Sequence, residues 1–328
     1  MSIKDVAARA GVSIGTVSNF LNKPELVAQS TQDRIREAID QLGFIRNESA
    51  RQLRAGTSRI IGLVLLDVRN PFFTDLARGA EQAAESAGLA VMLCSSDELA
   101  EKETRYLGLL QEQRVRGILI TPVDGNDRQL AAIRDRGTPV VLVDRASSTG
   151  NECSVDVDDV LGGRLAVQHL AEGGHRRIAF VGGPQTLRQV ADRWKGASEA
   201  AGSKVRLSLV PTPALTTEGG RQAAEKLVSL PASKRPTAVF CANDLLALGV
   251  LQELMRQRIR VPEDVALVGY DDIDFAAAAA VPLTSVRQPR AELGRAAAEL
   301  LIAEAAGGPH THQQLSFEPE LVVRASSR

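Results

Sequence analysis

The sequence predicts an all-α helix-turn-helix head followed by an α/β core of two Rossmann-like lobes, each built on a parallel sheet. Residues 3–22 contain two short helical patterns around a glycine-containing corner, as in a helix-turn-helix. From residue 60 onward, apolar runs of strand length alternate with helical segments, and this alternation occurs twice. The 328 residues suffice for several domains, and we divide the chain into a head (1–46), a hinge or linker (47–58) and a core (60–328).

The first helix of the head is predicted to run from residue 3 to residue 10. Ser2 is its candidate N-cap, with Asp5 three residues later as in a capping box. Gly11 ends this helix because glycine enters the left-handed C-cap conformation without steric cost. Ser13 then caps a second helix, which extends to residue 22 and turns Val17 toward the first.

The second helix is expected to enter the major groove of DNA, where the base edges carry a distinguishable pattern of donors and acceptors. An Asn side chain can bridge the edge of an adenine, so Asn19 is predicted to read a base and Thr16 or Ser18 to contact phosphate. The alternative for the same stretch is an ordinary amphipathic helical hairpin. The residues predicted to face DNA are Ser13, Ile14, Gly15, Thr16, Ser18, Asn19 and Asn22.

A third helix is predicted at residues 31–42, where apolar residues recur at helical spacing, and Gly43 ends it. It would close a small core over the first two helices. Next, residues 47–55 form a helical pattern too short to be stable alone in water. Arg51 and Arg54 flank an isolated Leu53 there, so this stretch is either a solvated linker or a hinge helix that orders on DNA.

The core is predicted as two runs of alternating strands and helices. The expected strands lie at 60–66, 89–94, 117–120 and 140–143 in the first lobe and at 178–181, 208–210, 238–241 and 265–268 in the second. The expected helices lie at 72–87, 98–113, 127–136, 162–172, 193–201, 218–230 and 244–256. Crossovers are expected near 155–161 and 284–290, and a helix at 291–305 and a strand at 320–323 close the chain.

Acidic and amide side chains come directly after several predicted strands. In open parallel sheets a ligand lies beyond the carboxyl ends of the strands, and Asp and Asn groups there can bind adjacent hydroxyls. Arg193 is predicted to open a helix beside this cleft, and aromatic side chains can stack on a sugar or a base. The candidate ligand-binding residues are Asp67, Phe72, Phe73, Asp144, Arg193, Trp194, Asn243 and Asp271.

Each candidate also has a purely structural interpretation. An Asp that follows a strand often caps the next helix. Phe72 and Phe73 are equally compatible with the hydrophobic core, and Trp194 with packing against the sheet.

Charge and hydropathy restrict the class of protein. The net charge is −1, and the first 58 residues carry eight Lys or Arg against six Asp or Glu, so any DNA-binding surface must be a local patch. The chain shows no apolar signal segment and no apolar run of about 18 residues, the length of a membrane helix. We therefore expect a cytoplasmic protein without a membrane partner.

The reactive residues give no catalytic or metal-binding pattern. Cys94, Cys153 and Cys241 are far apart and are expected to be buried free thiols. The four histidines have no spacing that suggests a metal, so no metal and no cofactor is predicted. No dinucleotide-binding glycine pattern follows the first strand, and neither a P-loop nor a Ser/His/Asp order is present, which disfavours an enzyme.

Several short motifs occur in a characteristic order. Besides residues 3–22 they are Ala-Arg-Gln-Leu at 50–53, Ile-Gly-Leu at 61–63, Asn-Pro-Phe-Phe at 70–73, Val-Asp-Arg at 143–145, Gly-His-Arg-Arg-Ile-Ala-Phe at 174–180, Cys-Ala-Asn-Asp at 241–244, Val-Gly-Tyr-Asp-Asp at 268–272 and Pro-Glu-Leu-Val-Val-Arg at 319–324. With the head, the short hinge and the doubled core, they resemble the LacI/GalR family of transcription regulators over essentially the whole chain.

The resemblance implies a repressor whose core has the fold of a type I periplasmic sugar-binding protein, forms a homodimer and binds a small effector. The effector that we expect is a sugar or sugar derivative. It implies a pseudo-palindromic DNA operator and a hinge helix in the minor groove, with Ala50, Arg51, Leu53 and Arg54 as contacts. It also places an effector-contacting arginine at Arg193. The alternative is a soluble sugar-binding protein without a transcriptional role, which the core alone would permit.

Two positions depart from the family pattern. Many members have Arg at the position of Asn19 and a bulkier side chain at the position of Gly15. We therefore expect an operator preference that differs from that of the best-known members.

Overall fold

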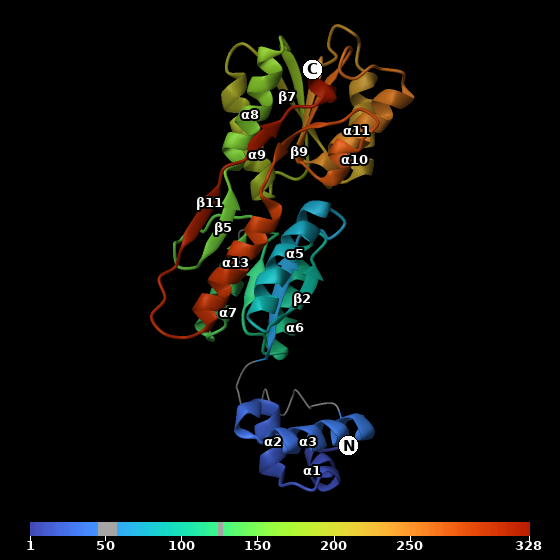
Figure 1. Cartoon of the computed structure of the whole chain (residues 1–328). Coiled ribbons are helices and arrows are strands. Elements are labelled where there is room, and N and C mark those ends of the chain that lie inside the picture. The colour runs from blue at the N-terminus through green and yellow to red at the C-terminus, as the bar shows by residue number, and fades with distance from the viewer. Residues whose placement is uncertain (45–57, 124–126) are drawn as a thin grey trace. The chain divides into compact units, whose positions relative to one another are not determined.

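The computed structural model describes residues 1–44, 58–123 and 127–328, and the chain divides into two compact units, Met1–Ser58 and Arg59–Arg328 (Figure 1). The predicted hinge contacts Ala50, Arg51, Leu53 and Arg54 lie outside the described residues. None of the described helices is both long enough and apolar enough to cross a membrane.

The first unit contains the predicted helix-turn-helix. Its elements are α1 (Ile3–Ala10), α2 (Ile14–Asn22), the 3₁₀ turn η1 (Pro24–Leu26) and α3 (Gln29–Leu42). The Asp5 carboxylate accepts a hydrogen bond from the Ser2 backbone N–H at 2.7 Å, and Ser13 Oγ accepts one from the Thr16 backbone N–H at 3.0 Å. The predicted caps of both helices are thereby confirmed, while α3 begins two residues earlier than predicted.

The core of this head is small and fully apolar. Val6 on α1, Val17 on α2 and Ile35 on α3 are each 0% exposed and pack together. Gly11 and Gly43 end α1 and α3 with φ of 64° and 57°, in the left-handed region where glycine is favoured. One face of each helix therefore packs into the core, and the outer face of α2 is largely exposed.

The second unit contains two six-stranded sheets. The first has the order β11-β5-β4-β3-β1-β2 and the second β12-β10-β9-β8-β6-β7; the neighbours are parallel except β10 and β12, which are antiparallel. The first sheet consists of β1 (Ile60–Leu65), β2 (Ala90–Ser95), β3 (Ile118–Ile120), β4 (Val140–Val143), β5 (Ser154–Val157) and β11 (Gln314–Phe317). The second consists of β6 (Arg177–Gly182), β7 (Arg206–Pro211), β8 (Ala238–Cys241), β9 (Ala266–Asp271), β10 (Thr284–Arg287) and β12 (Glu320–Val322).

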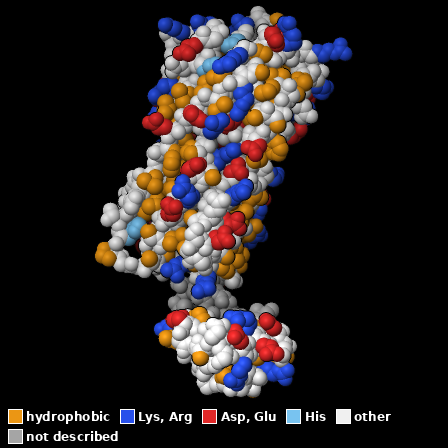
Figure 2. Space-filling view, viewed as in Figure 1, with side chains coloured by type: hydrophobic (Ala, Val, Ile, Leu, Met, Phe, Trp, Pro, Cys, Tyr) orange, Lys and Arg blue, Asp and Glu red, His pale blue; other side chains and the backbone are white. Residues whose placement is uncertain are grey.

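Helices cover both sheets. The first lobe has α5 (Pro71–Ser86), α6 (Ala100–Glu112), α7 (Asp127–Asp135) and α13 (Arg290–Ala305); the second has α8 (Asp159–Glu172), α9 (Arg188–Ala201), α10 (Thr217–Val228), α11 (Asp244–Arg256) and the short α12 (Asp274–Ala277). The turn η2 (Ala325–Ser327) follows β12. On the face that Figure 2 shows, Lys and Arg side chains alternate with Asp and Glu, in keeping with the net charge of −1.

The two predicted crossovers are corrected in detail. Residues 155–161 include most of β5 and residues 284–290 include β10, so both regions contain strands rather than plain connections. The chain also passes between the lobes a third time, from β11 to β12, which the sequence did not reveal. These strands are only four residues long, and β11 is largely exposed at a sheet edge, so they lack the apolar run that marks a buried strand.

Three helix pairs pack unusually closely, and each pair uses one glycine from each helix. A Cβ added at Gly294 on α13 would lie 1.8 Å from the Leu76 carbonyl oxygen on α5, and one at Gly79 on α5 would lie 2.0 Å from the Ala291 oxygen. The pairs α8/α9 and α10/α11 repeat this arrangement. A Cβ added at the glycine of either helix would lie 1.8–2.1 Å from a backbone oxygen of the other helix. No side chain fits at these positions, so the glycines fix how near the helices lie.

Candidate functional site

A cavity between the two lobes collects most of the predicted ligand-binding residues. The carboxyl ends of the parallel strands meet there from both sheets, which is where open α/β sheets bind ligands. Asp67 follows β1, Asp144 follows β4, Asn243 follows β8 and Asp271 ends β9. Seven of the eight predicted residues line the cavity: Asp67, Phe72, Phe73, Asp144, Arg193, Asn243 and Asp271.

The backbone is strained at two of these strand ends. Asp144 has a φ of 57° and Asp271 a φ of 102°, in the left-handed region that residues with a side chain seldom adopt. Such conformations cost about 1–3 kcal/mol each and cluster at functional sites. The turn directs both carboxyl groups into the cleft, where they are 5% and 2% exposed.

Hydrogen bonds join the lobes directly across the cavity. Asn70 Nδ2 of the first lobe donates to Asp271 Oδ2 of the second at 3.0 Å. Gln189 Nε2 of the second lobe donates to the Asp144 carbonyl oxygen and to its Oδ2, both at 2.9 Å. The space left for the centre of a water molecule is about 30 Å³. Since this holds little more than one or two waters, a sugar enters only if the lobes or these side chains move apart.

Arg193 is the buried cation of the cleft, at 4% exposure. Its Nε donates to Asp159 Oδ1 at 2.8 Å, its Nη1 donates to the Ala242 carbonyl oxygen at 2.7 Å, and its guanidinium lies 3.7 Å from the Tyr270 ring centroid. The prediction that Arg193 opens a helix is wrong, because α9 begins at Arg188 and places Arg193 in its second turn. Leu187, the N-cap residue of α9, and Gln189 in its first turn also line the cavity.

More acidic than basic side chains line the cleft. Burial and the nearby Asp159 carboxylate raise the pKa of Asp144, against the opposing effect of Arg193. Burial raises the pKa of Asp271 to about 6, again opposed by Arg193 and by the hydrogen bond from Asn70. Among the described residues, Asp144 Oδ1 is buried and accepts no hydrogen bond. The site can therefore accept hydrogen bonds from hydroxyl groups of a ligand.

Trp194 does not join the predicted site, since the described residues that line the cavity do not include it. Its ring packs 5.5 Å from that of Phe180 and faces the core of the second lobe, as the alternative interpretation held. Residues 193 and 194 are neighbours on α9 and therefore point about 100° apart around the helix. The predicted stacking role of Trp194 is corrected accordingly.

Some residues that line the cavity also have a structural role. Asn243 caps α11 by accepting from the Leu246 N–H at 2.9 Å, and Phe72 and Phe73 belong to the hydrophobic core as well as to the cavity wall. Asn70, Gln189 and Glu98 line the cavity and were missed as candidates. Asn70 opens α5 next to the phenylalanines and carried a recognisable signal, whereas Gln189 and Glu98 are ordinary polar residues in sequence.

The outer face of α2 in the head holds the predicted DNA contacts. Ser13, Ile14, Gly15, Asn19 and Asn22 are exposed, and Thr16 and Ser18 are half-buried. Asn22 Nδ2 donates to the Ser18 carbonyl oxygen at 2.8 Å, and Ser13 Oγ and Thr16 Oγ1 lie 2.9 Å apart. The predicted base-reading residue Asn19 thus lies on the exposed face of α2.

Comparison with known proteins shows the family of the chain. Residues 2–47 match the family described as bacterial regulatory proteins, lacI family, and residues 167–327 match a periplasmic binding protein-like domain. The HTH-type transcriptional repressor PurR of Aliivibrio fischeri (strain MJ11) is 34% identical over 331 residues, covering 99% of this chain and 98% of that protein. The chain belongs to the LacI family of bacterial regulatory proteins.

Solved LacI-family structures share the whole architecture. A complex of the transcriptional regulator CelR with cellobiose is 32% identical, with a TM-score of 0.73 and 99% of each chain covered. The lac repressor dimer bound to operator and the anti-inducer ONPF is 25% identical, with a TM-score of 0.87, and covers 100% of this chain and 99% of the repressor. This LacI-family chain is thus a DNA-binding transcriptional regulator with a ligand-binding core, and not an enzyme.

Proposed function

We propose that this protein is a repressor that binds a pseudo-palindromic operator as a homodimer and is controlled by a small effector in the cleft between its lobes. The effector class that fits best is a sugar or sugar derivative. Because its target is chromosomal DNA, we place its action in the cytoplasm. The observation that carries the proposal is the interlobe cluster of Asp144, Asp271, Asn243 and Arg193 beside Phe72 and Phe73.

The chemistry of this cluster supports a polyhydroxylated ligand. Carboxylates and amide oxygens accept from hydroxyl groups, the guanidinium and amide nitrogens donate to them, and an aromatic ring offers an apolar face to a sugar ring. The cellobiose held by the related CelR regulator supports the same class. In this chain Asp144 Oδ1, which accepts from none of the described groups, is the acceptor we assign to an effector hydroxyl.

The closed cleft suggests how the effector acts. A sugar that occupies it must replace the Asn70–Asp271 and Gln189–Asp144 hydrogen bonds, because these close the space that it needs. The lobes would then rest at a different separation in the ligand-bound state than in the closed state. A ligand shifts an equilibrium only through such a difference in affinity between two states.

On the DNA side, we propose that α2 lies in the major groove, with Asn19 on a base edge and Thr16 or Ser18 on phosphate. The hinge residues Arg51 and Leu53 would enter the minor groove between two head domains. The similarity to the lac repressor dimer bound to operator supports both proposals and the dimer.

The effector proposal is tested by thermal-shift measurements with cellobiose, a panel of monosaccharides and polyols, and nucleosides. A ligand that binds only the folded state stabilises it by RT ln(1 + [L]/Kd), so the melting temperature rises with ligand concentration. Asp144→Asn, which keeps the shape of the side chain, should abolish the shift. Glu199→Gln, at an exposed ion pair with Arg164 outside the cavity, is the matched control and should preserve it. Equal shifts in both variants would exclude the cleft as the effector site.

Arg193 is left unchanged in this experiment. Its removal would leave Asp159 and Asp271 as buried carboxylates without their cation, and breaking a buried ion pair from one side costs about 3–5 kcal/mol. An Arg193→Ala variant would therefore confuse lost binding with lost folding.

A further inference from the structure

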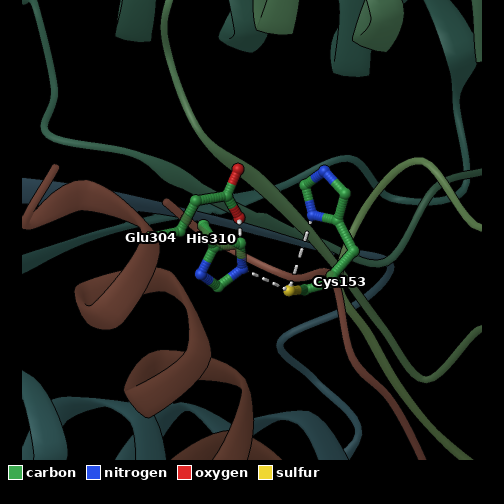
Figure 3. A group of neighbouring side chains, drawn as sticks. Cys153, Glu304 and His310 are labelled. Carbon is green, nitrogen blue, oxygen red and sulfur yellow. Dashed lines mark hydrogen bonds and ion pairs between the residues drawn. The ribbon is translucent and has the colours of Figure 1, made fainter. Parts of the chain in front are cut away.

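Four side chains that could bind a metal ion lie close together in the first lobe, at the C-terminal end of α13. Cys153 directly precedes β5, Glu304 lies in the last turn of α13, and His310 and His312 lie between α13 and β11. One ligand atom from each residue lies within 4.8 Å of all the others. Figure 3 shows the sulfur of Cys153 and the carboxylate of Glu304 both close to the His310 ring, where each approaches the same nitrogen, Nε2.

Three of the six separations between the four ligand atoms are close to those around one tetrahedral metal ion. Cys153 Sγ lies 3.1 Å from His310 Nε2 and 3.8 Å from His312 Nδ1, and His310 Nε2 lies 3.7 Å from Glu304 Oε2. Metal–ligand bonds of about 2.0–2.3 Å at tetrahedral angles place neighbouring ligand atoms about 3.3–3.6 Å apart. These three distances scatter around this range, and the other pairs of ligand atoms lie within 4.8 Å of each other.

We propose that Cys153, Glu304, His310 and His312 bind a divalent transition metal ion, with Zn²⁺ as the best match. A thiolate and a carboxylate carry two negative charges and the two imidazoles none, so a divalent cation makes the site neutral. Imidazole and thiolate select a borderline-soft ion such as Zn²⁺ over Mg²⁺ or Ca²⁺. Four protein ligands leave no open position, which is the arrangement of a structural site rather than a catalytic one.

The surroundings of the four residues favour a cation as well. Glu304 Oε2 is buried, and within the described chain no hydrogen-bond donor reaches it, a costly state that a metal would relieve. The Gln313 backbone N–H donates to Cys153 Sγ at 3.4 Å, as an outer-shell donor to a metal thiolate does. The carbonyl end of α13 carries partial negative charge beside the site.

The loop between α13 and β11 is built to return across the end of the helix. Gly307 and Gly308 have φ of 81° and 110°, a conformation that residues with a side chain rarely adopt. The reversal brings His310 and His312 back over Glu304. His312 is exposed, which gives an ion a path from solvent, while Cys153 is fully buried.

A nucleophilic Cys–His–Glu arrangement fits the same residues less well. The Cys153 thiol is 0% exposed, so a substrate cannot reach it in this structure. Burial also raises the pKa of Cys153, whereas a nucleophilic cysteine needs a lowered pKa and access to solvent. A metal ion would lower the pKa of the thiol by coordinating it directly.

The proposal is tested on the full-length protein without a polyhistidine tag, after removal of metal with a chelator. We expect one Zn²⁺ per chain by equilibrium dialysis with elemental analysis, and a higher melting temperature with Zn²⁺ than without. Co²⁺ in the same site should give the visible bands of a tetrahedral ion and a near-ultraviolet thiolate-to-cobalt band. The variant Cys153→Ser should lose the thiolate band, while Cys94→Ser should keep it.

A substitution of a second proposed metal-binding residue keeps the test decisive if Cys153→Ser fails to fold. His312 is exposed, so His312→Ala should fold like wild type and yet weaken Zn²⁺ binding at least roughly tenfold, as loss of a contact to a metal site does. His175→Ala, in the second lobe, is the matched control and should bind like wild type. The proposal is overturned if Zn²⁺ binds equally well to His312→Ala, if Co²⁺ shows no thiolate band, or if the wild type binds less than one ion per chain at saturation.

Discussion

At the residue scale, the strand-end carboxylates determine what the cleft recognises. Asp271 accepts from Asn70 of the other lobe and from Gln288 Nε2 at 2.8 Å, and it faces Arg193 across 3.9 Å. Its pKa rises from 3.8 to about 6 because burial outweighs these contacts. The folded protein therefore holds this proton over a pH range in which the unfolded chain has released it.

The first prediction concerns this proton. Between pH 3.8 and about 6 the folded state binds more protons at Asp271 than the unfolded state does, so this group makes stability fall as pH rises through that window. Asp271→Asn fixes the neutral form, and its stability relative to wild type should rise by roughly 2–3 kcal/mol between pH 4 and pH 7. The measurement is urea unfolding of both proteins at several pH values. Parallel pH dependences would contradict the assigned shift.

A second residue-scale prediction concerns base reading by the head. Asn19 is exposed on α2, and its amide can bridge an adenine edge. Asn19→Ala should relax preference at one position of each operator half-site, at a cost of about 1–3 kcal/mol there. Binding to a library of operator variants measures this. Uniform weakening on every sequence would make Asn19 a backbone contact instead.

At the scale of elements, helix pairs closed by glycine hold the site in place. α9 carries Gln189 and Arg193, and its distance from α8 is set by Gly163 and Gly196. A Cβ at Gly196 would lie 1.8 Å from the Val160 carbonyl oxygen, so any larger residue must push the two helices apart. Arg193 would then move away from Asp159 on α8.

We predict opposite effects for the same substitution at two helical glycines. Gly196→Ala should destabilise the core by about 1–3 kcal/mol or more through overpacking and should weaken effector binding. Gly108→Ala, on α6, meets no atom within 4 Å and should stabilise by about 0.5–1 kcal/mol, because alanine is the better helix former. Urea unfolding compares the two. Equal effects would show that the contact at Gly196 does not limit α9.

Many but not all of the helices, strands and cavity residues could be predicted from the sequence. Apolar runs and capping residues predicted the helix-turn-helix, the alternation of the core and the strand-end Asp and Asn residues at the cavity, because these signals are local. The ligand role of Arg193 came from the family resemblance. The strands β5, β10 and β11 were missed since each is only four residues long, and β11 pairs with a strand far away in the chain, β5. The position of Trp194 depends on where α9 begins, which was predicted five residues too late. Cys153 lies more than 150 residues from the other three proposed metal ligands in the chain, and no spacing rule detects such a group.

At the scale of the whole molecule, the proposed hinge must link the effector to the DNA. Residues 47–55 are too short to form a helix alone, and two copies held by a dimer are proposed to order in the minor groove. Leu53 would act there as an apolar wedge at a flexible pyrimidine–purine step, which costs a few kcal/mol of unstacking and bends the duplex.

The wedge gives a prediction of its own. Leu53→Ala should strongly weaken operator binding and reduce DNA bending, while effector affinity of the free protein stays nearly unchanged. A DNA-bending assay and effector calorimetry on wild type and variant measure the two effects separately. An undiminished bend in the variant complex would make Leu53 an ordinary linker residue.

We propose that a ligand in the cleft controls operator affinity, and thermodynamic linkage allows this control to be measured directly. Fluorescence anisotropy of a labelled operator is titrated with the full-length protein, with and without the carbohydrate that gives the largest thermal shift, for wild type and Asp144→Asn. We predict that the ligand changes the operator affinity of the wild type by about 5–150-fold, a typical allosteric coupling, and leaves that of Asp144→Asn unchanged. Identical operator curves for the wild type with and without the ligand would contradict the account.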